Sequence, residues 1–175
     1  MGDPGQEAVT VQRYDPRWPL WAEAEMRLLR GTLGHQIAGL EHIGSTAVPG
    51  LDAKPTVDLM LGTRAWPWSA EEDARLAQAG HHLYEVPDPR WRFYIKARGR
   101  RVRGFHLHIV EAGGGRWHEL LHFRDWLRNR PGDARTYVRL KKELARRFEH
   151  DRLAYQDAKA DLIGAILARA VTPST

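Results

Sequence analysis

The segment 42–61, with the sequence His-Ile-Gly-Ser-Thr-Ala-Val-Pro-Gly-Leu-Asp-Ala-Lys-Pro-Thr-Val-Asp-Leu-Met-Leu, constrains the fold of this chain most strongly. Its middle is a tight loop, because proline presets φ and glycine alone enters the positive-φ region at little cost. Residues 56–61 then alternate as a strand, which places Asp58 on the face opposite the apolar side chains. This is the layout of a phosphate or metal site, although a loop of fixed shape can also be only a connector.

Hydrophobic periodicity and turn residues predict the other elements. Strands are expected at 11–14, 36–43, 56–61, 81–86, 91–97 and 102–110, and helices at 16–33, 69–79, 116–130, 133–149 and 151–170. The first helix is expected to bury Leu20, Trp21, Ala24, Leu28 and Leu29. Strands come first and the last third is helical, so the predicted fold class is α+β, a mixed sheet covered by helices.

Composition limits the kinds of partner and of compartment. A chain of 175 residues is long enough for one buried core, so we expect a disordered segment at 1–10 and a single domain at 11–172. The absence of cysteine excludes disulfides and thiolate metal sites. The chain lacks a signal peptide pattern and an apolar run of about 20 residues, which indicates a cytoplasmic protein. A net charge of +5 favours anionic partners such as nucleotides or RNA.

Several segments together resemble the GrpB family of bacterial proteins, some of which are fused to dephospho-CoA kinase. The resemblance starts in the loop segment 42–61 and continues through Phe-His-Leu-His-Ile-Val at 105–110, Phe-Arg-Asp-Trp-Leu-Arg at 123–128, Tyr-Val-Arg-Leu-Lys at 137–141 and Tyr-Gln-Asp-Ala-Lys at 155–159. It spans roughly residues 11–170. It implies the fold of the polymerase-beta-like nucleotidyltransferases, while the substrate of the family is unsettled.

The resemblance also implies roles for particular residues. Gly44 and Ser45 are similar to the Gly-Ser signature with which these nucleotidyltransferases hold phosphates, and Thr46 adds a donor. Asp58 matches the first carboxylate of their Asp-x-Asp pair and would bind Mg²⁺. The second carboxylate position is Met60, which cannot bind a hard cation and leaves catalytic activity open.

His106 and His108 are the other side chains that could bind a metal or act as a base. At positions i and i+2 they share one strand face about 6 to 7 Å apart, close enough for a common ligand. With Asp58 opposite they would form a two-His-one-carboxylate set, which would suit a softer divalent metal such as Mn²⁺ better than Mg²⁺. Alternatively one of them is a general base, or both, like His42, only line a polar groove.

Cationic residues are expected beside this set. Lys54, four residues before Asp58, either pairs with phosphate or neutralises the aspartate. Tyr155 and Lys159 lie on one helical face, match the family pattern and are assigned to nucleotide binding; Arg124, Arg128 and Lys141 also match the pattern.

Two functions of different kinds follow. The first is a nucleotidyltransferase that uses a nucleoside triphosphate and a divalent metal to modify an unidentified acceptor, with Asp58, His106 and His108 as catalytic residues. The second is a non-catalytic protein that binds a nucleotide or another phosphorylated small molecule. RNA binding through the basic segment 90–103 is a weaker alternative, and no membrane partner is expected.

Overall fold

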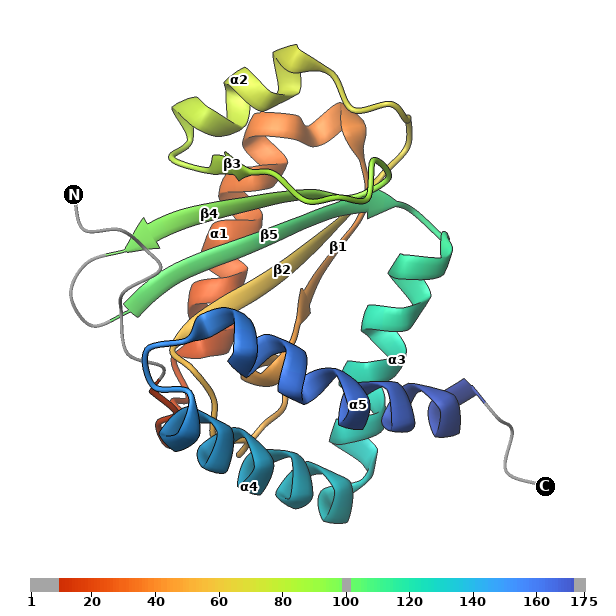
Figure 1. Cartoon of the computed structure of the whole chain (residues 1–175). Coiled ribbons are helices and arrows are strands. Elements are labelled where there is room, and N and C mark those ends of the chain that lie inside the picture. The colour runs from red at the N-terminus through yellow and green to blue at the C-terminus, as the bar shows by residue number, and fades with distance from the viewer. Residues whose placement is uncertain (1–9, 99–101, 172–175) are drawn as a thin grey trace.

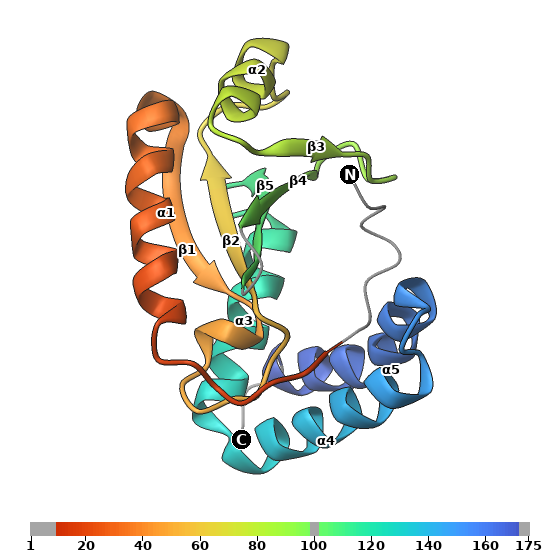
Figure 2. The same cartoon turned by 90° about the vertical axis from the view of Figure 1, so that its left-hand side faces the viewer.

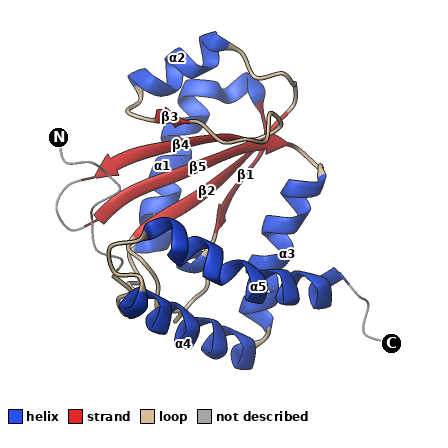
Figure 3. Cartoon of the chain, in the orientation of Figure 1, coloured by secondary structure: helices blue, strands red, loops and turns tan. Residues whose placement is uncertain are grey.

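A computed structural model describes residues 10–98 and 102–171, and its centre is a five-stranded mixed sheet (Figures 1 and 3). The strands are β1 (Ile37–Ile43), β2 (Thr56–Thr63), β3 (His82–Tyr84), β4 (Arg92–Arg98) and β5 (Val102–Glu111), in the order β1-β2-β5-β4-β3. β2 and β5 pair in parallel, and the other neighbours are antiparallel. The predicted α+β class with a mixed sheet is therefore confirmed.

The helices form layers on the two faces of this sheet. They are α1 (Trp18–Leu33), α2 (Ala70–Gln78), α3 (Gly115–Asn129), α4 (Pro131–Arg147) and α5 (Arg152–Val171), with short 3₁₀ turns η1 (Gly34–Gln36) and η2 (Ser45–Ala47). Figure 2 shows α1 along one face of the sheet and α3 on the opposite side, where α4 and α5 lie across its end. No helix in the described ranges is long and apolar enough to cross a membrane.

The alternation of β2 and β5 separates an apolar face from a mixed one. Val57, Leu59 and Leu61 of β2, with Phe105 and Leu107 of β5, are buried under α1. Their burial, at about 1.5 to 3 kcal/mol for each large side chain, fixes the register and so sends the intervening residues to the other face.

Part of that other face is apolar as well. Met60 is fully buried in a cluster with Ile43 and Val110, and Trp117 of α3 packs against the cluster. Trp117 lies so close to Gly39 and Gly62 that a Cβ there would come within 2.5 Å and 2.7 Å of its ring. The position of the expected second carboxylate is thus inside a hydrophobic contact between sheet and helix.

The predicted buried face of the first helix is correct for Leu29, and Trp21 is partly buried against the core, but the rest of the prediction is wrong. Leu20 and Leu28 are 61% and 43% exposed, and the buried residues are Trp18, Ala22, Glu25, Leu29 and Leu33. The reason is Glu25, which periodicity assigns to the polar face. Its carboxylate accepts hydrogen bonds from His81 at 2.9 Å and from Lys96 at 2.6 Å, so the true stripe includes an acid paired inside the core.

Other boundaries also differ from the predictions. Residues 11–14 form one isolated bridge, Gln12 to Ala53, in place of an edge strand. Pro131 was expected to separate two helices but is the first residue of α4, because a proline in the first turn lacks only an N–H that would be unbonded there. The predicted disorder at 1–10 and the basic segment 90–103 fall partly on residues outside the described ranges.

Candidate functional site

Asp58 and two histidines form the centre of the site. The parallel register of β2 and β5 places Asp58 opposite His106 and Met60 opposite His108. His106 Nδ1 lies 3.0 Å from Asp58 Oδ1, and His108 Nε2 lies 3.9 Å from the same oxygen. The side chains are 26%, 20% and 15% exposed for Asp58, His106 and His108, so solvent reaches all three.

The two histidines keep the aspartate ionised. Burial would raise the pKa of Asp58, but the hydrogen bonds and charges of His106 and His108 outweigh it and hold this pKa well below its usual value. Asp58 is therefore a carboxylate at neutral pH, with one oxygen turned toward the histidines.

A glycine lets the loop after β1 approach the other oxygen of this carboxylate. Gly44 has φ +70°, and a Cβ at this position would lie 2.5 Å from Asp58 Oδ2. The loop then makes the turn η2, in which Val48 N donates to Ser45 O at 3.2 Å. The predicted loop residues Gly44, Ser45 and Thr46 thus start directly beside the carboxylate of Asp58.

The side chain of His42 forms a hydrogen bond within this loop. Its Nε2 lies 2.9 Å from Thr46 Oγ1. Burial lowers the pKa of His42 to about 4, Asp58 opposes this shift, and Arg128 and Arg124 add to it. The imidazole is consequently neutral at physiological pH.

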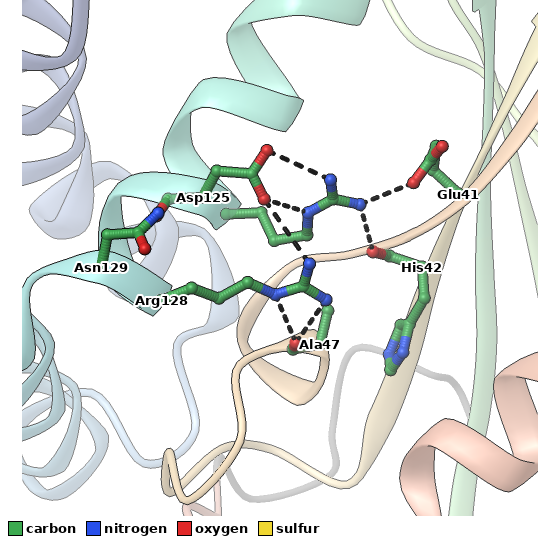
Figure 4. Close-up of polar contacts among 7 residues, drawn as sticks. Glu41, His42, Ala47, Asp125, Arg128 and Asn129 are labelled. Atoms are coloured by element: carbon green, nitrogen blue, oxygen red, sulfur yellow. Dashed lines mark hydrogen bonds and ion pairs between the residues drawn. The ribbon is translucent and has the colours of Figure 1, made fainter.

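Two arginines of α3 hold the backbone of the loop, as Figure 4 shows for Arg128. Arg128 donates from Nε and Nη2 to the carbonyl of Ala47, at 3.0 Å and 2.8 Å. Arg124, which is buried, donates from Nη1 to Glu41 at 2.7 Å and to the carbonyl of His42 at 3.1 Å. Asp125 pairs with both guanidinium groups, so one turn of α3 fixes both ends of the segment 41–47.

Lys54, which precedes β2, and residues of α4 and α5 form a cationic part of the site. The ring of the buried Tyr155 is 4.0 Å from the ammonium group of Lys54 and 4.5 Å from that of Lys159. The three residues assigned to nucleotide binding here are therefore neighbours in space, although Tyr155 and Lys159 come about 100 residues after Lys54.

Lys141 connects the cationic side to the aspartate. It is 3% exposed, its Nζ donates to the carbonyl of Asp52 at 2.7 Å, and it lies 4.7 Å from the ring of Tyr137. Burial and then repulsion from Lys159 lower the pKa of Lys141 to about 7, against the attraction of Asp52 and Asp58. Among the described residues it forms no ion pair, since the carboxylate of Asp52 contacts Lys142 at 2.5 Å instead.

Tyr137 joins the loop to the same group. Burial raises the pKa of Tyr137 to about 12, a hydrogen bond with Ser45 opposes this rise, and the charge of Asp58 adds to it. Tyr137 was not predicted as a site residue, and Lys141 was named only as one of the cations that match the family pattern. Their spacing of four within a matched family segment was the available signal, because it places both on one face of a helix.

Aromatic residues on β4 and just before it pack against the two histidines of β5. Trp91 stacks on His108 with ring centroids 5.6 Å apart and an interplanar angle of 5°, and Phe93 lies 5.1 Å from His106 and 5.0 Å from His108. His108 Nδ1 is buried and has no hydrogen-bond partner among the described residues. This packing limits the rotation of both imidazoles.

The described residues contain no group of three or more His, Asp or Glu side chains arranged to hold a metal ion.

Comparison with known proteins identifies the family. The model of the GrpB protein family matches residues 8–169. This chain belongs to the GrpB family. A UPF0157 protein of Pseudomonas aeruginosa is 38% identical over 169 residues, which are 94% of this chain and 69% of that protein. A UPF0157 protein of Halalkalibacterium halodurans is 34% identical, covering 95% and 85%.

A solved structure agrees with this assignment. The crystal structure of the conserved protein GrpB from Enterococcus faecalis superposes with a TM-score of 0.82 at 29% identity, over 92% of this chain and 96% of that one. The fold described here is therefore that of GrpB proteins, and the function of the family is unknown.

Proposed function

We propose that this protein has a nucleotidyltransferase-like fold and that its Asp58 site binds a nucleoside triphosphate with a divalent cation, Mg²⁺ or Mn²⁺. The site would transfer the nucleotidyl group to an unidentified acceptor. One observation carries this proposal. Lys141, a buried lysine without an ion pair among the described residues, lies near enough to Asp58 to be affected by its charge, and the loop at Gly44 closely approaches the same carboxylate.

The cationic side favours an anionic ligand. A buried ammonium group that lacks a carboxylate partner is unfavourable, and a phosphate beside it would compensate. Lys54 and Lys159 add positive charge around Tyr155, and the Ser45 hydroxyl and the backbone of the loop add neutral donors. Phosphate oxygens are the acceptors that this combination fits best.

The opposite side provides the groups for transfer. Asp58 Oδ2, together with phosphate oxygens, would hold the cation, which when bound neutralises charge on the phosphates. Asp58 Oδ1 orients His106 through Nδ1 at 3.0 Å and leaves Nε2 to accept a proton. In the reaction, the acceptor oxygen forms a bond to the α-phosphorus, the bond to pyrophosphate breaks, and His106 takes the proton of the acceptor hydroxyl.

Calorimetric titration with nucleoside triphosphates and Mg²⁺ or Mn²⁺ tests the binding step. We expect Asp58→Asn to remove the dependence on the cation and Lys141→Met to weaken binding at least tenfold, about 1.4 kcal/mol. Lys142→Met is the matched control, because Lys142 is the exposed neighbour that pairs with Asp52. A bound phosphate should raise the pKa of Lys141, so binding near pH 7 should take up a proton, which is measured by comparing buffers of different ionisation enthalpy. Unchanged nucleotide affinity in both Asp58→Asn and Lys141→Met would refute the proposal.

The burial of Met60 favours a second candidate, a protein that binds the nucleotide without turning it over. The substitution Met60→Asp cannot simply restore a carboxylate pair, because an acid among Ile43, Val110 and Trp117 would be desolvated and is expected to unfold the protein. The discriminating measurement is mass spectrometry of the wild-type protein with labelled triphosphates and a metabolite pool. Labelled product or pyrophosphate indicates transfer, and saturable binding with neither indicates the binding protein.

A further inference from the structure

A concave surface lies away from Asp58, where residues 48–52 meet the end of α3 and the first turns of α4. This α3–α4 groove has a volume of about 1090 Å³, and neither Asp58 nor the two histidines beside it line it. Seven apolar residues line it: Pro49 and Pro131 are exposed, Val138 is half-buried, and Val48, Leu51, Leu127 and Ala134 are buried behind them. A groove of this size and lining is large enough for a small organic molecule, whose pockets typically measure about 300 to 1,000 Å³.

The charges around the groove are predominantly positive. Arg128, Arg135 and Arg139 line it, and the last two are exposed. Within the described part of the chain, Arg135 and Arg139 form no ion pair; Arg139 donates only to Thr136 Oγ1, at 3.3 Å. The carboxylate that lines the groove, Asp52, is neutralised by Lys142 at 2.5 Å. Guanidinium groups without carboxylate partners beside an apolar surface suit an oxyanion that carries an apolar body.

We propose that the α3–α4 groove is a binding site for a small amphipathic anion, with an alkyl or aryl body on the apolar side chains and a sulfate, carboxylate or phosphate head at Arg135 and Arg139. The head alone would be held weakly, because exposed charges are solvated and screened by salt. The body alone would lack a partner for the arginines. Affinity should therefore need both parts of the ligand. This inference does not depend on the nucleotide site proposed above.

The test uses the whole protein and three matched probes: octyl sulfate, 1-octanol and methyl sulfate. Calorimetry is expected to give octyl sulfate, below its micelle concentration, a dissociation constant at least tenfold lower than that of either other probe. Naphthalene-1-sulfonate replaces the alkyl chain by rings and so distinguishes an alkyl from an aryl ligand. Amide shifts in nuclear magnetic resonance spectra locate the bound probe, and they are expected at residues 48–52 and 131–139.

Two variants separate this site from general attraction of anions to a basic protein. The double variant Arg135→Glu with Arg139→Glu should weaken octyl sulfate binding at least tenfold, whereas Arg30→Glu with Arg146→Glu changes the net charge equally at exposed positions outside the groove and should not. Gly132→Leu should also weaken binding. Gly132 lines the groove and a Cβ there meets no atom within 4 Å, so a leucine side chain would take up space that the ligand needs. Equal affinity for octyl sulfate and 1-octanol, equal losses in the two double variants, or shifts at other residues would overturn the proposal.

Discussion

Gly44 shows how a single missing side chain positions the loop. The backbone of this residue approaches Asp58 so closely that a methyl group would overlap the carboxylate, and its φ of +70° is one that other residues rarely adopt. The hydroxyl of the neighbouring Ser45 forms a hydrogen bond with Tyr137.

Gly44→Ala is therefore expected to lower the free energy of unfolding by about 2 to 4 kcal/mol, through backbone strain and a 2.5 Å contact with Asp58 Oδ2. Urea denaturation measures this change. The matched control is Gly31→Ala in α1, where a Cβ meets no atom within 4 Å and the helix should gain up to about 1 kcal/mol. If both variants change the free energy of unfolding by the same amount, the close approach of Gly44 to Asp58 does not contribute to stability.

At the scale of elements, α3 determines where the loop lies. Arg124 reaches from this helix to the carbonyl of His42 and to Glu41, and it is buried at the contact. Removing it leaves a partly buried carboxylate and a backbone carbonyl without their donor.

Arg124→Ala is expected to cost about 2 to 4 kcal/mol of stability and to speed hydrogen exchange of the amides at 44–48. Arg27→Ala removes an ion pair of 2.8 Å that is 64% exposed on the arginine side, so it should change stability by less than about 0.5 kcal/mol. Denaturant unfolding of both variants and exchange measured by mass spectrometry test the pair. Unaltered exchange in the loop would mean that α3 does not hold it.

The elements themselves were largely predictable from the sequence, and the faces that they bury were less so. Alternation located β2 and β5 and placed Asp58 and His106 on one face, because the period of a strand is local information. The face of α1 was missed because the burial of Glu25 depends on His81 and Lys96, which lie on other elements. The periodicity of one helix cannot predict that a charged side chain is buried when its partners lie on other elements.

For the whole molecule, stability should fall in acid in two stages. The pKa of His42 is about 4 in the folded state and near 6.5 in the unfolded chain, so between these values the unfolded state binds more protons. The free energy of unfolding should accordingly decrease as pH falls from about 6.5 to 4, by about 2 to 3 kcal/mol from this residue. Asp58, whose folded pKa is lowered, adds a further loss below about pH 4.

Chemical denaturation across this pH range measures the effect. His42→Gln should flatten the slope between pH 4 and 6.5, and His150→Gln, at an exposed position, should leave it as it is in the wild type. A slope that is identical in wild type and His42→Gln would show that burial of this imidazole does not contribute.

The candidate site was predictable only in part, for a reason that belongs to the whole chain. Loop and strand residues such as Ser45 and Asp58 could be proposed from the sequence, because local pattern and family resemblance point to them. Tyr137 and Lys141 join them only because α4 packs against the loop, and no local pattern specifies that contact. Likewise, the burial of Met60 depends on α3 covering the sheet.

The parallel pairing of β2 with β5 has a kinetic consequence. Asp58 and His106 are 48 positions apart, and β4 and β3 lie between their strands in the chain. Non-local strand pairing of this kind carries a large loop-closure penalty and tends to form slowly during folding. We therefore expect the contact between Asp58 and His106 to form late in refolding, so ligand binding that depends on this contact should be recovered only with the last folding steps.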